Sequence, residues 1–255
     1  MTQMTRRSFI KATGAGLAAS ASPFILSKVN GASPNEVVNH AVVGTGGQGS
    51  GHAGGFAKTK NTRLVAICDV DPVRLENTAK KVSEVANVKT YTDFRRLLDD
   101  KDIDSISIAT CDHWHTPVAL AAIMAGKHVY VEKPCSQTVH EANLLVRAAK
   151  QHNKCVQHGT QRRSSTALIA VEKALRKGTI GEVYMAKAIN HQRRKKIGKA
   201  EPTNPPEGVN YDLWLGPAPL AQFSKNRWHY QWHWFWDYGG GDLVNDGIHH
   251  LDLAI

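Results

Sequence analysis

The sequence lacks several patterns that would assign it to a specialised class of protein. Its four cysteines form no C-x-x-C pair and predict no disulfide framework, so we interpret them as small, buried apolar side chains. Its thirteen histidines include no H-E-x-x-H or comparable ligand spacing, and we therefore predict no metal site. Basic residues form no broad stripe interleaved with aromatics, which argues against nucleic acid as a partner.

The chain also lacks an apolar run long enough for a stable membrane span. Residues 12–26 are only mildly apolar and contain glycines and a proline. They follow residues 5–11 (TRRSFIK), which resemble the twin-arginine export signal. We therefore predict that residues 1–32 are a targeting segment, and that the folded protein is periplasmic or secreted. Small residues at 19–21 and 31–32 offer two cleavage sites, and a disordered basic tail is the alternative interpretation.

Charge is unevenly distributed along the chain. The formal net charge is +10, but residues 1–32 contribute four basic residues and no acid, which leaves about +6 for the remainder. The clearest basic run, residues 193–196, is interpreted as a solvated loop. The 255 residues are 42% hydrophobic and 21% charged, which is typical of a globular protein with one large domain or two small ones.

Two regions with different patterns follow the targeting segment. From residue 37 to 158, predicted strands alternate with predicted helices, which is typical of a parallel sheet covered by helices on both faces. The predicted strands are 37–43, 63–68, 103–109, 128–131 and 155–158, and the predicted helices are 50–57, 71–86, 92–98, 117–125 and 139–152. We therefore predict an α/β domain with a doubly wound parallel sheet over residues 36–158.

The second predicted domain, residues 159–255, follows a different plan. Its segments are a helix over 164–177, a strand over 182–190, a proline-rich loop over 195–208 and an aromatic-rich stretch over 228–238. This combination predicts an α+β domain. Because the chain ends inside a predicted helix, we expect the domain to be incomplete at Ile255.

A glycine-rich turn connects the first predicted strand to the first helix. Strand, G-x-G-x-x-G and helix in this order are the context that dinucleotide binding requires. Gly44 permits the tight turn, Gly46 lets the backbone approach a pyrophosphate, and Gly49 lets helix and strand pack closely. The cofactor-binding residues predicted in this turn are Gly44, Gly46, Gly47, Gln48 and Gly49.

Asp69 ends the second predicted strand, twenty residues after Gly49. An acidic residue at this position accepts hydrogen bonds from the adenosine ribose and repels a 2′-phosphate. We therefore predict NAD as the cofactor, with NADP less favoured. Arg74 is close enough in the sequence to keep NADP open.

Polar residues follow two further predicted strands. Residues 110–115 (TCDHWH) follow the third strand, and Glu132-Lys133-Pro134 follow the fourth. Ligands of an open α/β sheet bind outside the carboxyl ends of its strands, so these side chains should lie at one edge of the cofactor cleft. The cofactor-binding residues predicted there are Thr110, His113, His115, Glu132 and Lys133, with Asp112 beside them.

Lys133 is the predicted catalytic residue at this edge. It precedes Pro134, which biases its backbone away from helix and permits a cis bond. The positive charge of a nearby nicotinamide would lower the pKa of its amine. Such a lysine can polarise a substrate hydroxyl or shuttle its proton. A surface lysine before a turn is the alternative.

These motifs together resemble the glucose–fructose oxidoreductase/inositol dehydrogenase (Gfo/Idh/MocA) family. The matching segments are 44–49, 110–115, 125–129, 132–134 and 239–252. The resemblance implies a Rossmann domain followed by a domain with a large, mostly antiparallel sheet. It also implies an NAD(P)-dependent oxidoreductase acting on a hydroxyl of a sugar, cyclitol or related polyol. The export signal, DHWH and WDYGGG resemble the secreted bacterial branch.

The same resemblance implies the catalytic residues. In that family a lysine acts with an Asp that is followed four residues later by a His, which corresponds here to Lys133 and His249 with Asn245 in place of the Asp. An amide can orient a histidine but cannot act as a base. Asp246 and His250 form a competing pair about 100° around the helix, and Asp252 is a further candidate for support. The predicted substrate contacts are Lys133, Arg162, Trp236, Asn245, Asp246, His249 and His250.

Three functions from different classes stay open. In an NAD-dependent oxidoreductase, His249 would take the hydroxyl proton and Lys133 would assist. Since the periplasm has no obvious free nicotinamide pool, a redox-neutral lyase, glycoside-cleaving enzyme or epimerase is the alternative. Asn245 favours a non-catalytic binding protein as a third possibility. One or two aromatics of residues 228–238 can stack on a sugar, although core or subunit interface is their alternative role, and we expect a homo-oligomer by analogy.

Overall fold

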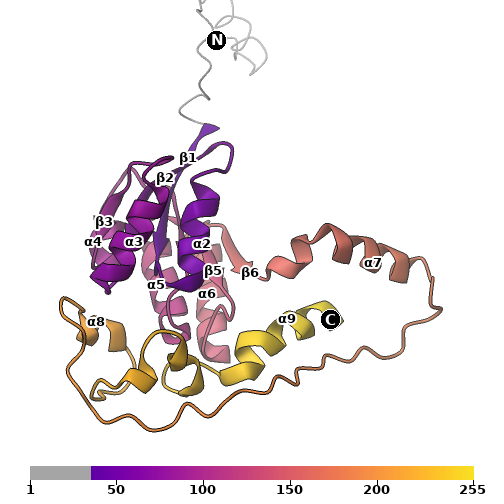
Figure 1. Ribbon diagram of the computed structural model, residues 1–255. Coiled ribbons are helices and arrows are strands. Elements are labelled where there is room, and N and C mark those ends of the chain that lie inside the picture. The colour runs from indigo at the N-terminus through magenta and orange to yellow at the C-terminus, as the bar shows by residue number, and fades with distance from the viewer. Residues whose placement is uncertain (1–35) are drawn as a thin grey trace, which may run out of the picture. The chain divides into compact units, whose positions relative to one another are not determined.

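The computed structural model of the protein describes residues 36–255 (Figure 1). The predicted targeting segment lies outside the described residues. The described chain contains a six-stranded parallel sheet in the order β3-β2-β1-β4-β5-β6. Its strands are β1 (Val38–Val43), β2 (Thr62–Cys68), β3 (Lys89–Tyr91), β4 (Ser105–Ile108), β5 (His128–Glu132) and β6 (Val156–Gly159). This is the doubly wound order. The chain adds strands toward one edge from β1 to β3 and toward the other edge from β4 to β6, and this switch leaves a binding crevice between β1 and β4.

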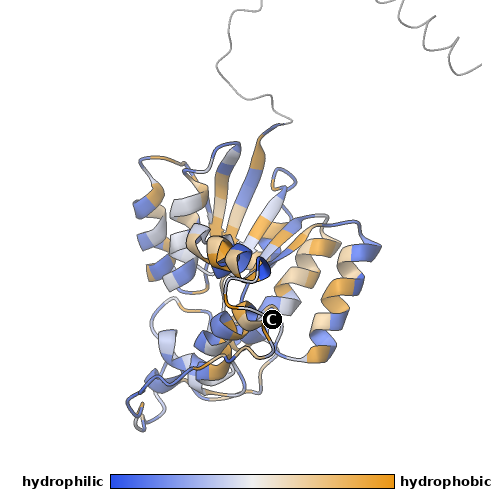
Figure 2. Cartoon of the chain, turned by 90° about the vertical axis from the view of Figure 1, so that its right-hand side faces the viewer, coloured by the Kyte–Doolittle hydropathy of each residue, from blue (hydrophilic) through white to orange (hydrophobic). Residues whose placement is uncertain are grey.

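Helices cover both faces of the sheet. They are α2 (Gly47–Phe56), α3 (Pro72–Val82), α4 (Phe94–Leu98), α5 (Asp112–Met124) and α6 (Val139–Gln151). Helices α2 and α3 enclose one apolar cluster around Val42 and Ile67. Helices α4, α5 and α6 enclose a larger cluster around Ile106 and Val131 on the other face. Hydrophobic residues recur along the strands (Figure 2), so the sheet is the centre of the core.

Local signals explain where several of these helices begin and end. Asp71 caps α3 by accepting the backbone N–H of Val73 at 2.9 Å, and Pro72 occupies the first helical position. Gly126, just beyond α5, has φ +80°, a left-handed conformation that glycine adopts without strain. These positions agree with the sequence predictions, although α3 ends at Val82 rather than at residue 86.

Two elements of this domain differ from the predictions. The fifth helix begins at Asp112 rather than at Pro117, which lies inside it. Proline is tolerated in the first turn of a helix, and the helix begins five residues before Pro117. Strand β3 was not predicted, because three residues with polar side chains show too little alternation to indicate a strand.

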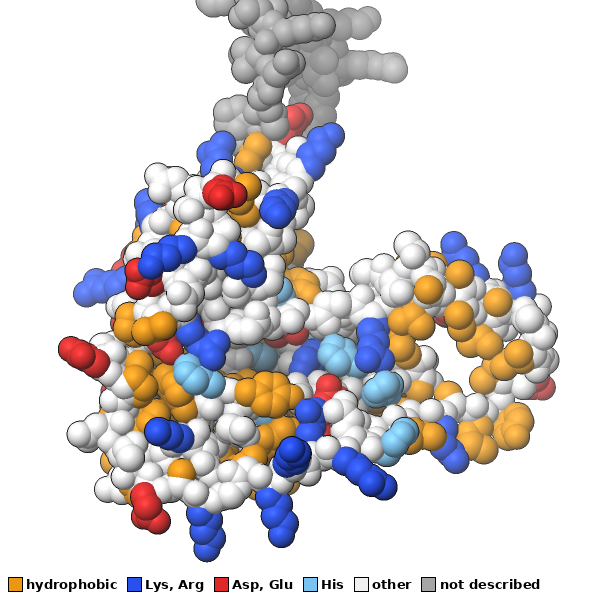
Figure 3. Space-filling model, in the orientation of Figure 1, with side chains coloured by type: hydrophobic (Ala, Val, Ile, Leu, Met, Phe, Trp, Pro, Cys, Tyr) orange, Lys and Arg blue, Asp and Glu red, His pale blue; other side chains and the backbone are white. Residues whose placement is uncertain are grey.

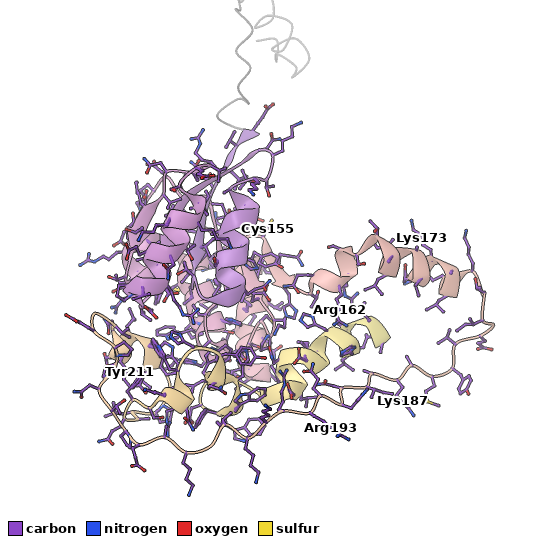
Figure 4. All side chains as sticks on the ribbon, in the orientation of Figure 1. Cys155, Arg162, Lys173, Lys187, Arg193 and Tyr211 are labelled. Atoms are coloured by element: carbon purple, nitrogen blue, oxygen red, sulfur yellow. The ribbon has the colours of Figure 1, made fainter. Side chains whose placement is uncertain are left out.

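The second region, after β6, contains mostly short helices. They are η2 (Gln161–Ser164), α7 (Thr166–Arg176), α8 (Tyr211–Leu215), η3 (Lys225–Arg227), η4 (His229–Trp234), η5 (Leu243–Gly247) and α9 (Ile248–Ala254). Residues 180–210 run as a long extended segment from α7 back to α8, past Lys187 and Arg193 (Figure 4). The second region packs against the loops at the carboxyl ends of the strands, for example where Asn245 contacts Lys133 after β5.

The strand expected over residues 182–190 and the antiparallel sheet implied for the second region are not present among the described residues. Residues 182–190 are extended, but no described segment pairs with them. A β-strand needs a neighbour to accept and donate its backbone hydrogen bonds, so an apolar sequence alone does not make one.

Aromatic residues form the core of the second region. Trp214, Phe223, Trp228 and Tyr238 are buried together with Cys111 from the Rossmann side. Trp228 and Tyr238 of the aromatic-rich segment therefore belong to this core. No helix among residues 36–255 is long and apolar enough to cross a membrane.

The four cysteines do not share one environment. Cys68 and Cys111 are buried, as interpreted from the sequence, but Cys135 is half-buried and Cys155 is exposed. Cys155 immediately precedes the edge strand β6, where its side chain is not covered.

Candidate active site

A cleft of about 580 Å³ lies at the carboxyl edge of the sheet. Its lining combines the glycine turn after β1, Asp69 after β2, Thr110 after β4 and Lys133 after β5 with residues of the second region. Figure 3 shows basic and histidine side chains gathered between the two parts. The position is the one expected for a ligand of an open α/β sheet.

The glycine turn has the geometry of a pyrophosphate cradle. Gly44 has φ +85°, and a Cβ there would lie 2.6 Å from the Ala109 carbonyl oxygen. A Cβ on Gly49 would lie 1.7 Å from the Gly44 carbonyl oxygen, so the close approach expected of Gly49 is observed and it packs beneath the turn rather than lining the cleft. Helix α2 begins here with no side-chain cap and no acidic residue in its first turn, and no atom is within 4 Å of a Cβ on Gly47. Open backbone N–H groups at a helix N-terminus therefore fit the phosphates of a dinucleotide.

Asp69 holds the glycine turn in place. Its carboxylate accepts the Thr45 backbone N–H at 2.6 Å and the Asp71 backbone N–H at 2.9 Å. Burial raises the pKa of Asp69, and these hydrogen bonds partly oppose the rise. The carboxylate lies at the cleft wall, where it can also accept bonds from ribose hydroxyls.

Lys133 connects the two parts of the chain inside the cleft. Its Nζ donates to the backbone oxygen of Asn245 at 2.8 Å and to the Asn245 side-chain oxygen at 3.0 Å. Burial lowers the pKa of Lys133, while the charges of Asp112 and Glu132 raise it in part. The peptide bond between Lys133 and Pro134 is cis, as the sequence permits.

The TCDHWH motif is divided by the first turn of α5. Asp112 and His115, three residues apart, face the cleft, while His113 faces the core of the second region. His113 is 2% exposed, and its Nε2 lies 3.1 Å from the Trp214 carbonyl oxygen. His113 was predicted to lie at the cofactor edge, but it does not line the cleft. The reason is that the helix extends further than we expected and rotates that side chain away.

Asp112 is a buried carboxyl near Lys133. Burial raises its pKa to about 7, and the charge of Lys133 and the backbone N–H of Gly240 limit the rise. His115 bridges the Pro134 and Thr110 carbonyl oxygens at 2.5 and 3.2 Å, and burial lowers its pKa to about 4. A neutral imidazole carries one N–H, so His115 donates to only one of these carbonyls, and the shorter contact assigns that hydrogen bond to Pro134.

Glu132 contacts two polar side chains, Gln161 and His52, that no sequence motif predicted. It accepts from Gln161 Nε2 at 2.5 Å and lies 2.9 Å from His52 Nε2. Burial alone would raise the pKa of Glu132, but His52 and Lys133 hold it below its ordinary value. His52 lies one turn after Gly49 on α2, and its spacing from the glycine turn is the only signal in the sequence that could have indicated it.

His249, Asn245 and Asp246 reach the cleft from the second region. Burial lowers the pKa of His249, and Lys133 lowers it further. The Asn245 amide nitrogen lies 3.2 Å from the Tyr230 hydroxyl, which directs its oxygen toward Lys133. Asp246 pairs with Arg194, so the run 193–196 is not simply a solvated loop.

Three predicted substrate residues, Arg162, Trp236 and His250, lie outside the cleft lining, as does Asp252, the further candidate for support. His250 faces Arg162, with Nδ1 and Nη1 3.3 Å apart, because it is about 100° around α9 from His249. Asp252 likewise pairs with Arg163 at 2.8 Å and fastens α9 to η2. The Trp236 side chain is 84% exposed, because it follows the η4 turn on its outer side. None of these four residues lines the cleft, so the structure does not support a substrate role for them.

Aromatic rings form the outer wall of the cleft. Trp114, Trp214, Trp228, Tyr230 and Trp232 line it. The Trp232 ring stacks on His233 with centroids 3.6 Å apart, and both residues line the cleft. Within residues 36–255 no group of three or more His, Cys, Asp or Glu side chains is arranged to hold a metal ion.

The fold and the cleft define a dinucleotide-binding protein of the Rossmann class. Residues 38–160 match a family model described as oxidoreductase family, NAD-binding Rossmann fold. Residues 180–254 match the oxidoreductase family C-terminal alpha/beta domain. Both models are of the Gfo/Idh/MocA family and together match more than three quarters of the chain, so the chain belongs to that family and its first domain binds NAD.

Similar curated proteins have two kinds of name. An inositol 2-dehydrogenase of Salmonella typhimurium strain LT2 is 32% identical over 146 residues, which are 56% of this chain and 43% of that protein. The glycosyl hydrolase family 109 protein 2 of Shewanella sp. strain ANA-3 is 32% identical over 172 residues, which are 59% of this chain and 38% of that protein. The chain spans less than half the length of these relatives.

Solved structures show the same fold. The scyllo-inositol dehydrogenase of Lactobacillus casei, with bound NAD(H) and scyllo-inositol, has a TM-score of 0.53 and 27% identity over 57% of this chain and 43% of that one. A Listeria innocua NAD-binding protein has a TM-score of 0.61 at 23% identity, over 85% of this chain and 53% of that one, and supports the fold alone.

Proposed function

We propose that the protein is an NAD-dependent oxidoreductase that acts on a CH–OH group of a cyclitol, sugar or related polyol. The observation that carries this proposal is the contact of Lys133 with Asn245 in a cleft that also contains the glycine turn and His249. A lysine, a histidine and a dinucleotide cradle line one cleft. That is the set of groups needed to remove a proton and a hydride from the same carbon–oxygen unit.

The chain's own residues would bind the alcohol and move its proton. NAD, when bound by the glycine turn and Asp69, supplies the hydride acceptor. His249 takes the hydroxyl proton, and burial keeps its imidazole neutral and therefore able to accept it. Lys133 donates a hydrogen bond to the same oxygen, with Asn245 orienting its amine. Asn245 cannot hold an imidazolium by charge, so the carboxylate of Asp246 at the cleft wall would provide that support.

The proposed substrate class rests on the wall and on the relatives. Aromatic faces such as that of Trp232 stack on the apolar C–H faces of sugar and cyclitol rings, while Asp246 and Asn245 can bind their hydroxyls. Inositol dehydrogenases are among both the curated relatives and the solved neighbours. These likenesses favour a cyclic polyhydroxy substrate.

The proposal can be tested by following NAD reduction with a panel of inositols and sugars. We expect Lys133→Ala and His249→Ala each to lower kcat/KM by about 100-fold or more, because general acid–base groups contribute on that scale. Lys187→Ala is the matched control, since Lys187 is exposed on the extended segment. Turnover that both site variants leave unchanged would contradict the assigned roles.

A redox-neutral reaction is the second candidate. The glycosyl hydrolase family 109 relatives favour a redox-neutral reaction, and their alignments cover up to 74% of this chain. Oxidation of a ring hydroxyl makes the neighbouring C–H acidic, and the same hydride is returned after exchange or elimination, so NAD is unchanged overall. Substrate recovered from D₂O would then carry deuterium without net NADH formation. Absence of both NADH and deuterium, with NAD bound, would favour a non-catalytic binding protein.

We also propose that the protein is exported in the folded state by the twin-arginine route, as residues 5–11 indicate. Export of a folded chain would allow NAD to be loaded in the cytoplasm. The homo-oligomer stays a prediction.

A further inference from the structure

One end of the cleft carries the groups expected to face adenosine. Asp69 marks the ribose position at the end of β2, and the loop from Val70 to Arg74 continues along the cleft wall. Arg74 lies directly beside the glycine turn, because a Cβ on Gly46 would be 3.1 Å from its Nη1. The adenosine half of NAD would therefore lie against this loop.

The second region reaches across to the same loop at three points. Arg74 Nε donates to His229 Nδ1 at 2.8 Å, and His229 Nε2 lies 4.0 Å from the Asp71 carboxylate. The Asn210 backbone N–H donates to the Val70 carbonyl oxygen at 3.3 Å. A Cβ on Gly208 would lie 3.0 Å from the Pro72 ring. The loop that recognises adenosine is thus held from outside by residues more than 130 positions later in the chain.

His229 is placed specifically for this contact. Its φ of +51° is a left-handed conformation that is strained for a histidine. It follows Trp228, which is buried in the aromatic core and also lines the cleft. Nδ1 accepts a hydrogen bond from a guanidinium, so the imidazole must be neutral there. The buried Trp228 therefore anchors His229, whose imidazole accepts the hydrogen bond from Arg74.

Arg74 uses its Nε–H for a contact within the protein, which leaves its two Nη groups for a 2′-phosphate. Its Nε is bonded to His229, and the Asp71 carboxylate lies 3.8 Å from it. Asp69 and Asp71 together place two carboxylates at this end of the cleft, where a further phosphate would be repelled. The arginine that kept NADP open in the sequence is used for a contact within the protein.

We propose that Trp228 and His229 complete the adenosine subsite, and that the Arg74–His229 hydrogen bond closes it over bound NAD. The ligand class is the adenosine ribose and adjoining phosphate of a dinucleotide. Release of the nucleotide requires this bond to break, so NAD leaves slowly. This inference does not depend on the proposed oxidoreductase activity, because it concerns retention of the nucleotide and not turnover.

The test measures nucleotide release and needs no substrate. The protein is loaded with NAD, or with ADP-ribose, which lacks the nicotinamide, and release is followed after dilution into excess competing nucleotide. We expect His229→Ala to accelerate release of both ligands about tenfold or more, since a hydrogen bond to a charged group is worth more than one between neutral groups. Arg74→Gln should do the same, and the double variant should add little to either single change.

A matched control and a folding check accompany these variants. His191→Ala removes an exposed histidine from the second region and should leave release unchanged. Circular dichroism of each variant establishes that it is folded. Release from folded His229→Ala that stays within twofold of the unaltered protein would overturn the proposal. So would fully additive effects of the two substitutions, because the residues would then act separately. A loss of turnover with normal retention would instead concern the proposed function.

Discussion

Asp112 shows at the scale of one residue how burial sets charge in the cleft. Its carboxyl is 5% exposed at the first turn of α5, and burial raises its pKa to about 7. Between about pH 4 and pH 7 the folded protein therefore holds a proton on this group that the unfolded chain has released. The free energy of unfolding contributed by Asp112 falls as pH rises through this interval and is level above it. The rise in pKa from 3.8 to about 7 corresponds to a decrease of at most about 4 kcal/mol in the free energy of unfolding across this interval.

We expect Asp112→Asn to remove this pH dependence. The amide has nearly the same shape and no charge to bury, so the variant should be more stable than the unaltered protein at pH 8 and similar to it near pH 4. Urea unfolding at several pH values measures the difference. Asp99→Asn, at an exposed position, is the control and should follow the unaltered protein throughout. A parallel pH profile for Asp112→Asn would show that the carboxyl titrates normally in the fold.

At the scale of an element, α6 illustrates how a short local pattern positions a helix. Thr138 Oγ1 accepts the Glu141 backbone N–H at 3.2 Å, and the Glu141 carboxylate accepts the Thr138 backbone N–H at 3.0 Å. This reciprocal pair satisfies two backbone groups that a helix start would otherwise leave unpaired. The same helix buries Leu145 against the core beneath β5 and follows Lys133 by only a few residues.

Thr138→Ala should therefore destabilise the protein by about 1 kcal/mol. The cause is the loss of one N-cap hydrogen bond at an exposed site, with little change in packing. Thr138→Ser keeps the hydroxyl and should recover most of the loss, as measured by urea unfolding at pH 7. Equal destabilisation by alanine and serine would mean that the threonine methyl group, and not the hydrogen bond, stabilises the helix start.

At the scale of the whole molecule, the cleft is formed by two parts that meet over one edge of a sheet. The Rossmann domain provides the nucleotide cradle and Lys133, while the second region provides His249, Asn245 and the aromatic wall. Neither part alone encloses the cleft. A protein assembled in this way has to fold completely before NAD is enclosed, which accords with the proposed export of the folded chain.

The export proposal predicts that the twin arginines are required. Changing Arg6 and Arg7 to lysine together should leave the protein in the cytoplasm, because the signal depends on the arginine pair and not on charge alone. Cell fractionation with an antibody against the folded protein measures this. Lys28→Arg is the control within the same segment, and a host without the twin-arginine translocase should reproduce the defect. Continued export of the double-lysine protein would exclude this route.

The sequence by itself determined the Rossmann domain and its cofactor. Strand, glycine turn and helix are local signals, and parallel strands bring Gly44, Asp69, Thr110 and Lys133 to one edge through topology alone. The family follows from the same motifs. These features were predictable because each depends on neighbours in the sequence or on a rule that holds for every parallel sheet.

Only the tertiary structure decided which side chains of the motifs face the cleft and what closes it. His113 turns away because α5 gains a turn, and His249 rather than His250 lines the cleft because of how α9 is fastened. The contacts of Lys133 with Asn245 and of Arg74 with His229 join positions 112 and 155 residues apart. No periodicity encodes pairs of that separation, since they are set by how two independently patterned regions pack against each other.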